Sequence, residues 1–299
     1  MYSMRERLIH LQRCRGITRR TIRKILHADP ALQQIFHLSS TQLSHLYLLS
    51  AKQATRLYSD LHNQTIKKQI AHDISKFTVI TIIDDDYPPV LQTIKDAPIV
   101  LYALGNISLL SHKPAISVIG TRNPSYEAKA KIEYIVKPLI KKDWLIVSGM
   151  AKGIDSFAHT LTLGNNGKTI AVLGGGFHHI YPRQNTALFK QITENGLVLS
   201  EYPPHTPPTR FHFPERNRII SGLSFGTLVI EATEKSGTLI TVDQALDQGR
   251  EVYAVPGSPL IEQTKGCLKM IQDGAKLVHC PQDIIEDWET IGQNMVYSK

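Results

Sequence analysis

The sequence is poor in cysteine: Cys14, Cys267 and Cys280 are the only three in 299 residues. No two of them are spaced as zinc ligands or as part of a disulfide framework, and so few thiols fit a reducing compartment. The chain also lacks an apolar run near the ~20 residues that a membrane span requires. Its first residues are interrupted by arginine and histidine, which argues against a secretory signal. We therefore expect a cytoplasmic protein that does not insert into membranes.

Familiar cofactor and metal motifs are missing as well. There is no Gly-x-Gly-x-x-Gly fingerprint with a following acidic residue, and no Walker loop, because Lys152 lies between Gly149 and Gly153 instead of after a long glycine-flanked loop. Three consecutive aspartates, residues 84–86, point in alternating directions on an extended chain, so they are poorly placed to hold one metal ion. The sequence predicts no cofactor and no metal site.

Positive charge is concentrated near the N-terminus. The whole chain carries a formal net charge of +8, and residues 1–75 hold 12 Lys/Arg against 4 Asp/Glu by direct count. Such a basic segment suggests a polyanionic partner, although a basic helical face is often only a solvated surface. Charge alone leaves both interpretations open.

The N-terminal 70 residues have the pattern of a small helical domain. Within it, "RGITRRTIRKIL" is loosely similar to a DNA-binding helix-hairpin-helix element, but a plain helical bundle fits equally well. Prolines and acidic residues mark residues 71–114 as a connecting segment that includes the first part of the core. We expect the core itself at 115–285 and a short tail at 286–299. The helices are expected at 4–12, 18–27, 30–38, 40–49 and 51–62.

Strand and helix patterns alternate after residue 115. Near-continuous Val/Ile/Leu strands separated by helices indicate a parallel sheet that is covered on both faces. The predicted fold class is α/β, with an extended Rossmann-like, doubly wound, mostly parallel sheet behind a small all-α domain. The strands are expected at 115–120, 144–149, 168–174, 197–202, 226–232, 251–257 and 275–280. The helices are expected at 125–142, 154–164, 185–196, 215–224, 239–249 and 266–274.

Four glycine-containing turns follow the predicted strands, at residues 120–125, 148–155, 174–182 and 234–241. Doubly wound sheets bind ligands beyond the carboxyl ends of their strands, where glycine allows backbone N–H groups to approach an anion. Arg122 and Lys152 add a cation to two of these turns. The turns therefore predict a shared phosphate-binding edge.

Catalytic groups are scarce at this edge. Asp155 and His159 are spaced to meet on one helix, but no nucleophile or third ligand accompanies them, and Ser236 lies in no nucleophile elbow. The pair Arg216 and Arg218, with Asn217 between them, begins the 215–224 helix, where it can cap the helix, bind carboxylates or hold phosphates. These features favour a binding site over an active site.

Taken in order, the motifs resemble the DNA-processing protein A family (DprA, also called Smf). The matching segments are "YPPVLQTIKDAPIVLYALGN", "VIGTRNPS", "IVSGMAKGIDSFAH", "TIAVLGGG", "IYPRQN", "SEYPP", "FPERNRIISGLS", "LVIEA", "SGTLITVDQALDQGREVYAVPG" and "GCLKMIQDGAK". The resemblance covers residues 80 to 280, with a looser match through the helical N-terminus.

The resemblance implies a non-catalytic protein of natural transformation, with an extended Rossmann-like core behind a small sterile-alpha-motif-like domain. It implies a homodimer that binds and protects incoming single-stranded DNA without sequence preference and helps to load the RecA recombinase onto it. Other competence or single-strand-binding proteins are further candidate partners, and the last two predicted helices are candidate interaction surfaces. The DNA-binding residues carried over by motif are Gly120, Arg122, Gly149, Lys152, Gly153, Gly174, Arg216, Asn217, Arg218, Ser236 and Gly237.

The chain departs from the family pattern at two places. His178 stands where the family usually has an acidic residue, which puts the role of that carboxylate in doubt here. The sequence after the core is also too short for the winged-helix domain of many members, so functions of that domain are not transferred. The aromatics Phe157, Phe177, Tyr181 and Phe211 are candidates for base stacking, but core packing explains most of them equally well.

Two other functions are considered. The "SGT" turn is similar to that of LOG-type nucleoside-monophosphate phosphoribohydrolases, but "EKSGTLITV" lacks their Pro-Gly-Gly lead and has no glutamate three residues after Thr238. A nucleotide-sensing regulator with a DNA-binding N-terminal domain would predict tight mononucleotide binding and a preference for duplex DNA. Nothing in the sequence requires either property.

Overall fold

The computed structural model describes residues 2–292. It divides into two compact units, one made of Met1–Tyr87 with Asp96–Tyr102 and the other of Pro88–Lys95 with Ala103–Lys299. The two units are described separately below.

The first unit is a helical bundle followed by a short strand. Serine and threonine side chains cap α1, α2, α3 and α4, and capping boxes at Ser3, Ser39 and Ser50 fix three of these starts. Apolar residues such as Leu8, Ile25 and Leu57 form its buried interior. The elements are α1 (Met4–Arg13), α2 (Arg19–Ala28), η1 (Gln34–Phe36), α3 (Ser40–Tyr47), α4 (Ala51–Leu61), α5 (Gln64–Lys76) and β1 (Thr78–Thr81).

Much of the basic charge of this unit is paired within it. Five arginines of the first 25 residues form ion pairs with aspartates, and two of them share Asp96. These arginines hold the bundle together, so they do not form a free basic surface. The pairs are Arg5–Asp84 at 2.9 Å, Arg13–Asp73 at 2.5 Å, Arg15–Asp60 at 2.7 Å, Arg19–Asp96 at 2.7 Å and Arg23–Asp96 at 3.1 Å.

Two expectations for this unit are wrong. The predicted helix at 30–38 is reduced to η1, because Leu32 takes a positive φ of 51° and the Asp29 carboxylate caps the backbone N–H of Gln34 at 2.7 Å. The helix α5 was not expected, although Asn63 caps its first turn by accepting from the Thr65 backbone N–H at 2.8 Å. In both segments, hydrogen bonds from a side chain to the nearby backbone determine where the helix begins or fails to form.

The second unit contains the predicted parallel sheet. Its strands follow the order β6-β5-β4-β3-β7-β8-β9, and each adjacent pair is parallel, which confirms the expected α/β class. The strand β2 (Val100–Gly105) begins in the first unit and ends in the second. The others are β3 (Ala115–Ile119), β4 (Leu145–Ser148), β5 (Thr169–Leu173), β6 (Leu197–Ser200), β7 (Gly226–Val229), β8 (Glu251–Ala254) and β9 (Lys276–Leu277).

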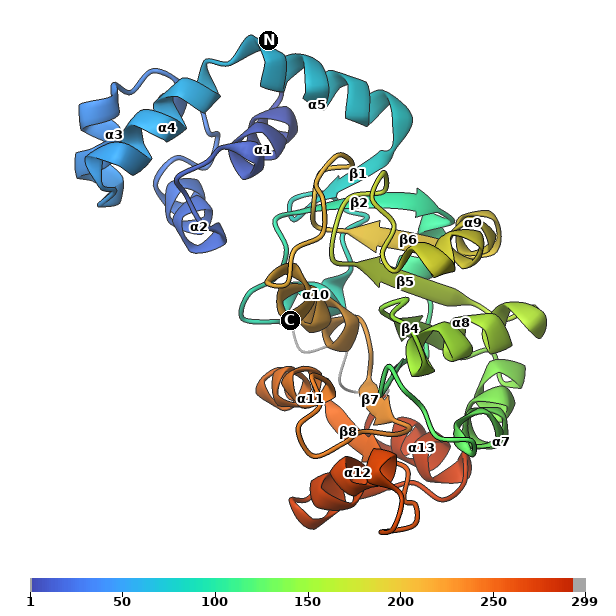
Figure 1. The fold of residues 1–299 in the computed structure, drawn as a ribbon. Helices are drawn as coiled ribbons and strands as arrows, with labels where there is room; N and C mark the ends of the chain where they lie inside the picture. The colour runs from blue at the N-terminus through green and yellow to red at the C-terminus, as the bar shows by residue number, and fades with distance from the viewer. Residues whose placement is uncertain (1, 293–299) are drawn as a thin grey trace. The chain divides into compact units, whose positions relative to one another are not determined.

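Helices cover both faces of this sheet (Figure 1). Ile116 and Val118 of β3 pack with α7 and α8, whereas Ser117 between them donates to the Ile220 carbonyl of α10 at 2.8 Å on the other face. The helical segments are α6 (Pro89–Gln92), η2 (Ile107–Ser111), α7 (Ala128–Lys141), α8 (Ile154–Gly164), η3 (Arg183–Asn185), α9 (Thr186–Asn195), α10 (His212–Gly222), α11 (Thr238–Asp247), α12 (Glu262–Gln272), α13 (Gln282–Asp287) and η4 (Trp288–Gly292).

Two helix starts in this unit differ from expectation. Helix α10 begins at His212, one turn before the predicted start, and α12 begins at Glu262 instead of 266. The buried strand β2 lies within residues 71–114, the segment expected to include the first part of the core. The early start of α10 matters for the site described below.

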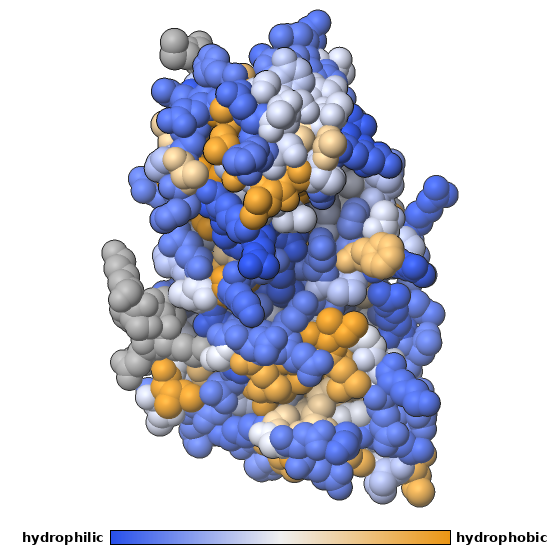
Figure 2. Space-filling model, turned by 90° about the vertical axis from the view of Figure 1, so that its left-hand side faces the viewer, coloured by the Kyte–Doolittle hydropathy of each residue, from blue (hydrophilic) through white to orange (hydrophobic). Residues whose placement is uncertain are grey.

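The surface seen in Figure 2 is mostly hydrophilic, with apolar side chains gathered over parts of it. Ile240 and Leu246 of α11 are 41% and 59% exposed, and Leu260 is 92% exposed. Within residues 2–292 we find no helix long and apolar enough to cross a membrane.

Candidate nucleic-acid interface

A large cleft lies at the carboxyl ends of β3 and β7. The chain runs outward from β3 to β4, β5 and β6 on one side, whereas β7 lies on the other side of β3, which makes the β3–β7 boundary the switch point of the sheet. The cleft has a volume of about 710 Å³. Doubly wound folds bind their ligands at this place because two successive turns diverge there and leave a crevice.

All four glycine-containing turns contribute to the cleft. The first supplies Gly120 to Asn123, the second Ala151 and Asp155, the third Tyr181, and the fourth Ser236 to Thr238 with Ile240 and Thr241. The segment 208–220, which includes the start of α10, forms the remaining wall. The predicted convergence of these turns at one edge is thus found in the structure.

The turn that carries Arg122 is held from beneath by Glu231. This residue is fully buried, and its carboxylate accepts from the Ser125 backbone N–H at 2.8 Å and from Lys131 at 2.9 Å. Its backbone carbonyl accepts from the Thr121 N–H at 2.8 Å. Although burial acts to lower it, the pKa of Lys131 is raised by its bond to Glu231, as expected for a strong buried pair. The turn is therefore rigid on its inner side.

Arg122 and Lys152 point their charges outward. Both are exposed, and the Lys152 Nζ lies 3.4 Å from the Asn123 Oδ1. The Arg122 guanidinium lies 5.7 Å from the centre of the Phe213 ring, where a cation–π contact steadies it. Arg122 lines the cleft, whereas Lys152 lies next to lining residue Ala151. Two accessible cations thus stand at the mouth of the cleft.

The second turn requires glycine at position 153. Gly153 has a φ of +88°, and a Cβ there would lie 2.4 Å from the Thr121 carbonyl oxygen. The first and second turns therefore touch through a residue that no other side chain replaces without strain.

Arg216 lies buried under the cleft. It is only 5% exposed, and its Nη1 donates to the carbonyls of Gly149 and Val172, at the ends of β4 and β5. A Cβ at Gly149 would lie 2.3 Å from this Nη1, so glycine there makes room for the guanidinium. Burial lowers the Arg216 pKa to about 10, which still leaves the group charged at neutral pH. Arg216 adds positive potential to the floor of the cleft while it also ties two strands together.

Among the described residues that line the cleft, Asp155 is the one with a carboxylate side chain. It accepts from the backbone N–H groups of Gly149 at 3.2 Å and Ala151 at 3.3 Å, and burial raises its pKa although Arg216 acts in the opposite sense. Its oxygens therefore stabilise the second turn.

His159 is buried and stays neutral. Thr169 donates its single hydroxyl proton to the Ile146 carbonyl at 2.8 Å, so the His159 Nδ1 at 2.7 Å must donate to the Thr169 oxygen. The Nε2 is buried without a partner, and burial lowers the His159 pKa to about 3. His159 packs as part of the core, and neither of its ring nitrogens makes a hydrogen bond to Asp155.

This histidine makes the fold acid-sensitive. An unfolded imidazole binds its proton near pH 6.5, whereas the folded one does not until about pH 3, so the free energy of unfolding falls as the pH falls between these values. By this linkage wild type loses about 2 kcal/mol between pH 7.5 and pH 5 through His159 alone. In urea titrations across this range, His159→Gln is expected to lose correspondingly less, and equal pH slopes for both proteins would contradict the assignment.

The remaining predicted residues occupy different positions. Asn217, Ser236 and Gly237 line the cleft, and the Ser236 hydroxyl accepts from the Thr238 N–H at the start of α11. Gly174 does not line the cleft but packs against the lining residue Phe213, because a Cβ at Gly174 would come within 2.9 Å of the Phe213 ring. Arg218 is buried and donates to the Glu201 carboxylate at 2.6 Å, a position away from the cleft lining.

Phe213 and Arg210 are among the lining residues that the sequence interpretation missed. Because α10 begins at His212, Phe213, Asn217 and Ile220 fall on one helix face at the spacing i, i+4, i+7, and all three line the cleft. A helix start placed one turn earlier would have shown this face. Of the four aromatics expected near the turns, Tyr181 lines the cleft, 5.4 Å from the Phe213 ring, whereas Phe177 is buried.

Comparison with known proteins now identifies the family. The family model described as DNA recombination-mediator protein A matches residues 78–289, which include every element of the cleft. The chain belongs to this family. It is 48% identical over 208 residues to DNA processing protein DprA of Bacillus subtilis, covering 70% of each chain. It is 39% identical over 274 residues to DNA processing protein DprA of Streptococcus pneumoniae, covering 92% of this chain and 95% of that one.

Solved structures of family members share the fold. The X-ray structure of DNA processing protein A from Streptococcus pneumoniae superposes with a TM-score of 0.84 at 37% identity, covering 94% of this chain and 97% of that one. DNA processing protein A from Helicobacter pylori, whose single-stranded DNA-binding mode has been described, superposes with a TM-score of 0.64 at 27% identity, covering 72% and 96%. Membership in the DNA recombination-mediator family gives this chain a role in DNA processing and recombination.

Proposed function

We propose that the chain binds single-stranded DNA in the cleft, without sequence preference, and passes it to the RecA recombinase in the cytoplasm. The observation that carries this proposal is the cleft itself: exposed cations and an aromatic pair surround a glycine-walled crevice at the switch point of the sheet. The single-stranded DNA binding of the Helicobacter pylori relative supports the same ligand.

Each part of the cleft has a partner on a DNA strand. Arg122, Arg210 and Lys152 are exposed and positive, which suits successive backbone phosphates, and backbone N–H groups at the start of α11 suit another. Phe213 and Tyr181 offer faces on which bases of any sequence can stack. A DNA strand, with its repeated phosphates and bases, can contact several of these groups at once, whereas a single nucleotide can contact only a few.

We propose binding without catalysis. Asp155 is held by two backbone N–H groups, and Thr241 stands three residues after Thr238, where the LOG-type hydrolases have their catalytic glutamate. The buried Glu231 is occupied by Lys131 and Ser125. The cleft therefore offers phosphate ligands without a carboxylate poised to act on a bound nucleotide.

We further propose that the protein acts as a homodimer. Leu246 at the exposed side of α11 and Leu260 before α12 are 59% and 92% exposed, and a second copy of the chain would bury these apolar side chains. These positions lie in and beside the last two helices expected from the sequence, which we regard as the region for self-association and for contact with the recombinase.

The function is tested by fluorescence-anisotropy titration of labelled dT, mixed-sequence and duplex strands over a salt series. We expect the two single strands to bind alike and more tightly than the duplex, with a slope of log affinity against log salt near −0.7 for each phosphate neutralised. Tighter binding of the duplex, or binding of a nucleoside monophosphate with release of its base, would overturn the proposal in favour of a regulator or a hydrolase.

A further inference from the structure

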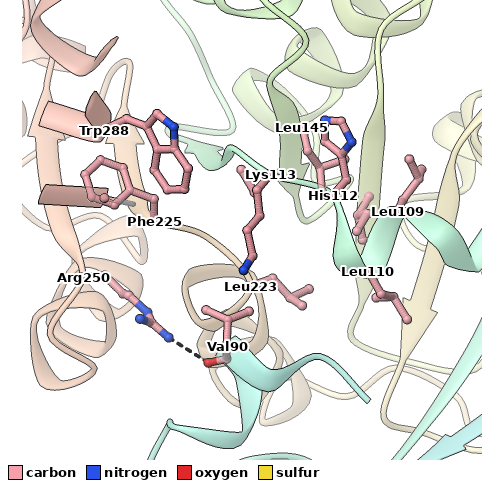
Figure 3. A pocket seen from close by; sticks show the side chains of 13 residues that line it. Val90, Leu109, Leu110, His112, Lys113, Leu145, Leu223, Phe225, Arg250 and Trp288 are labelled. Atoms are coloured by element: carbon pink, nitrogen blue, oxygen red, sulfur yellow. Dashed lines mark hydrogen bonds between the residues drawn. The ribbon is translucent and has the colours of Figure 1, made fainter. Parts of the chain in front are cut away.

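A DNA strand that is longer than the cleft must continue beyond it. The cavity drawn in Figure 3 lies at the amino ends of β3, β4 and β7, where Leu223, Phe225 and Trp288 are part of its lining. Its volume is about 30 Å³, room for about two water molecules, against about 710 Å³ for the cleft. This cavity cannot take a nucleotide, whereas the surface around the mouth of the cleft is open to a strand.

The starts of α7 and α8 lie side by side at this mouth. At one end the Nζ of Lys152, which stands just before α8, lies 3.4 Å from the Oδ1 of Asn123, a residue that lines the cleft. At the other end the Lys129 Nζ lies 5.2 Å from the centre of the Phe157 ring, and these two residues belong to the first turns of α7 and α8. The two turns therefore form one continuous surface that begins at the exposed cations Arg122 and Lys152.

Tyr126 stands on this surface with its side chain in solvent. It is 87% exposed and lies four residues after Arg122, which lines the cleft. The residue before it, Ser125, donates from its backbone N–H at 2.8 Å and from its hydroxyl at 2.5 Å to the buried Glu231 carboxylate. The backbone next to Tyr126 is therefore anchored, and only the side chain has to be ordered when the ring binds a base.

The charge of this surface suits a nucleic acid. Lys129 is exposed and lies three residues after Tyr126, so the two side chains are neighbours at the start of α7. The acidic residue between them, Glu127, is engaged by Lys131 at 3.2 Å. The next acidic residue along the helix is the exposed Glu133, one turn farther on, which would repel a phosphate. The favourable charge is thus confined to the end of α7 that adjoins the cleft.

We propose that a single strand seated in the cleft leaves it over the first turns of α7 and α8, where a base stacks on Tyr126 and a phosphate binds Lys129. This inference rests on the proposed function, because it requires DNA in the cleft, and it adds a contact outside the cleft lining. An exposed aromatic ring beside a cation can stack a base of any sequence and neutralise a neighbouring phosphate. The path runs from Arg122 and Lys152 to Lys129 and ends before Glu133.

Anisotropy titrations of the full chain with a labelled dT strand of about 16 nucleotides test the stack on Tyr126. Tyr126→Ala is expected to bind about tenfold more weakly with an unchanged salt slope, because a stacked base releases no counterion. Tyr126→Phe keeps the ring and should bind within about twofold of wild type. The matched control is Tyr134→Ala, since Tyr134 is 62% exposed on the same helix but lies beyond Glu133. Equal affinities of Tyr126→Ala and Tyr134→Ala would overturn the proposal.

Lys129→Gln tests the phosphate contact in the same titrations. It is expected to bind several-fold more weakly and to lower the salt slope by about 0.7, the contribution of one phosphate on a single strand, and an unchanged slope would also overturn the proposal. Tyr126 and Lys129 are exposed, so urea denaturation should give the same midpoint for each variant and for wild type. If wild type failed to bind the strand, the proposed function would fall together with this inference. Tight binding by wild type with no loss in Tyr126→Ala would overturn this inference alone.

Discussion

Replacement of Arg216 by methionine is expected to lower the free energy of unfolding by about 3–5 kcal/mol. The substitution leaves the buried carbonyls of Gly149 and Val172 without their donor, and it removes the positive charge that acts most strongly to lower the Asp155 pKa. Each unsatisfied buried group costs about 1–3 kcal/mol, which makes this one of the largest single-residue effects in the chain. Urea denaturation followed by circular dichroism measures it.

The matched control is Arg210→Met. Arg210 also lines the cleft and carries the same charge, but it is exposed, so its replacement should change the free energy of unfolding by less than about 0.5 kcal/mol. If Arg216→Met were as stable as the control, Arg216 would not be a structural residue. Its main role would then have to be the contact with DNA that the family resemblance implies.

The second large effect concerns affinity for DNA. The double variant Arg122→Ala, Lys152→Ala is expected to bind a dT strand about 100-fold more weakly at low salt, because two charge-assisted contacts together contribute about 2.7 kcal/mol. The salt slope should fall by about 1.4, the contribution of two phosphates on a single strand. Both side chains are exposed, so the fold should be unaffected. Anisotropy titrations at several salt concentrations measure both quantities.

The control for net charge is Lys141→Ala, Lys142→Ala. These exposed lysines end helix α7, close to Asp143 and the start of β4, at the edge of the sheet opposite the cleft. This variant should bind the strand nearly as well as wild type. Equal losses of affinity in the two double variants would mean that only the overall charge of the protein matters, and would contradict the assignment of the DNA site to the cleft.

The sequence predicted the core fold well because its signals are strong and local. Val/Ile/Leu strands alternate with helices after residue 115, and the existence of strands β3 to β9 and their sequence along the chain follow from that alternation. The four turns could be assigned to one edge because strands β3 to β9 all run in the same direction. What this pattern could not show is which strand pair forms the switch point, since that depends on long-range pairing of β3 with β7.

The less predictable features depend on tertiary contacts. Arg216 and Arg218 are two residues apart and look alike in the sequence, yet one reaches under the cleft to Gly149 and the other pairs with Glu201. Only the three-dimensional position of the carbonyl or carboxylate separates these roles. The basic N-terminal segment is a similar case, because Asp84 and Asp96, which lie outside it in sequence, neutralise three of its arginines.

The central claim is that single-stranded DNA lies in the cleft, and hydrogen-exchange mass spectrometry with and without a dT strand tests it most directly. The account predicts slower amide exchange at residues 120–123, 208–220 and 236–241, with residues 4–76 unchanged. Protection confined to residues 4–76, with the cleft segments exchanging as in the free protein, would contradict it and would move DNA binding to the helical unit.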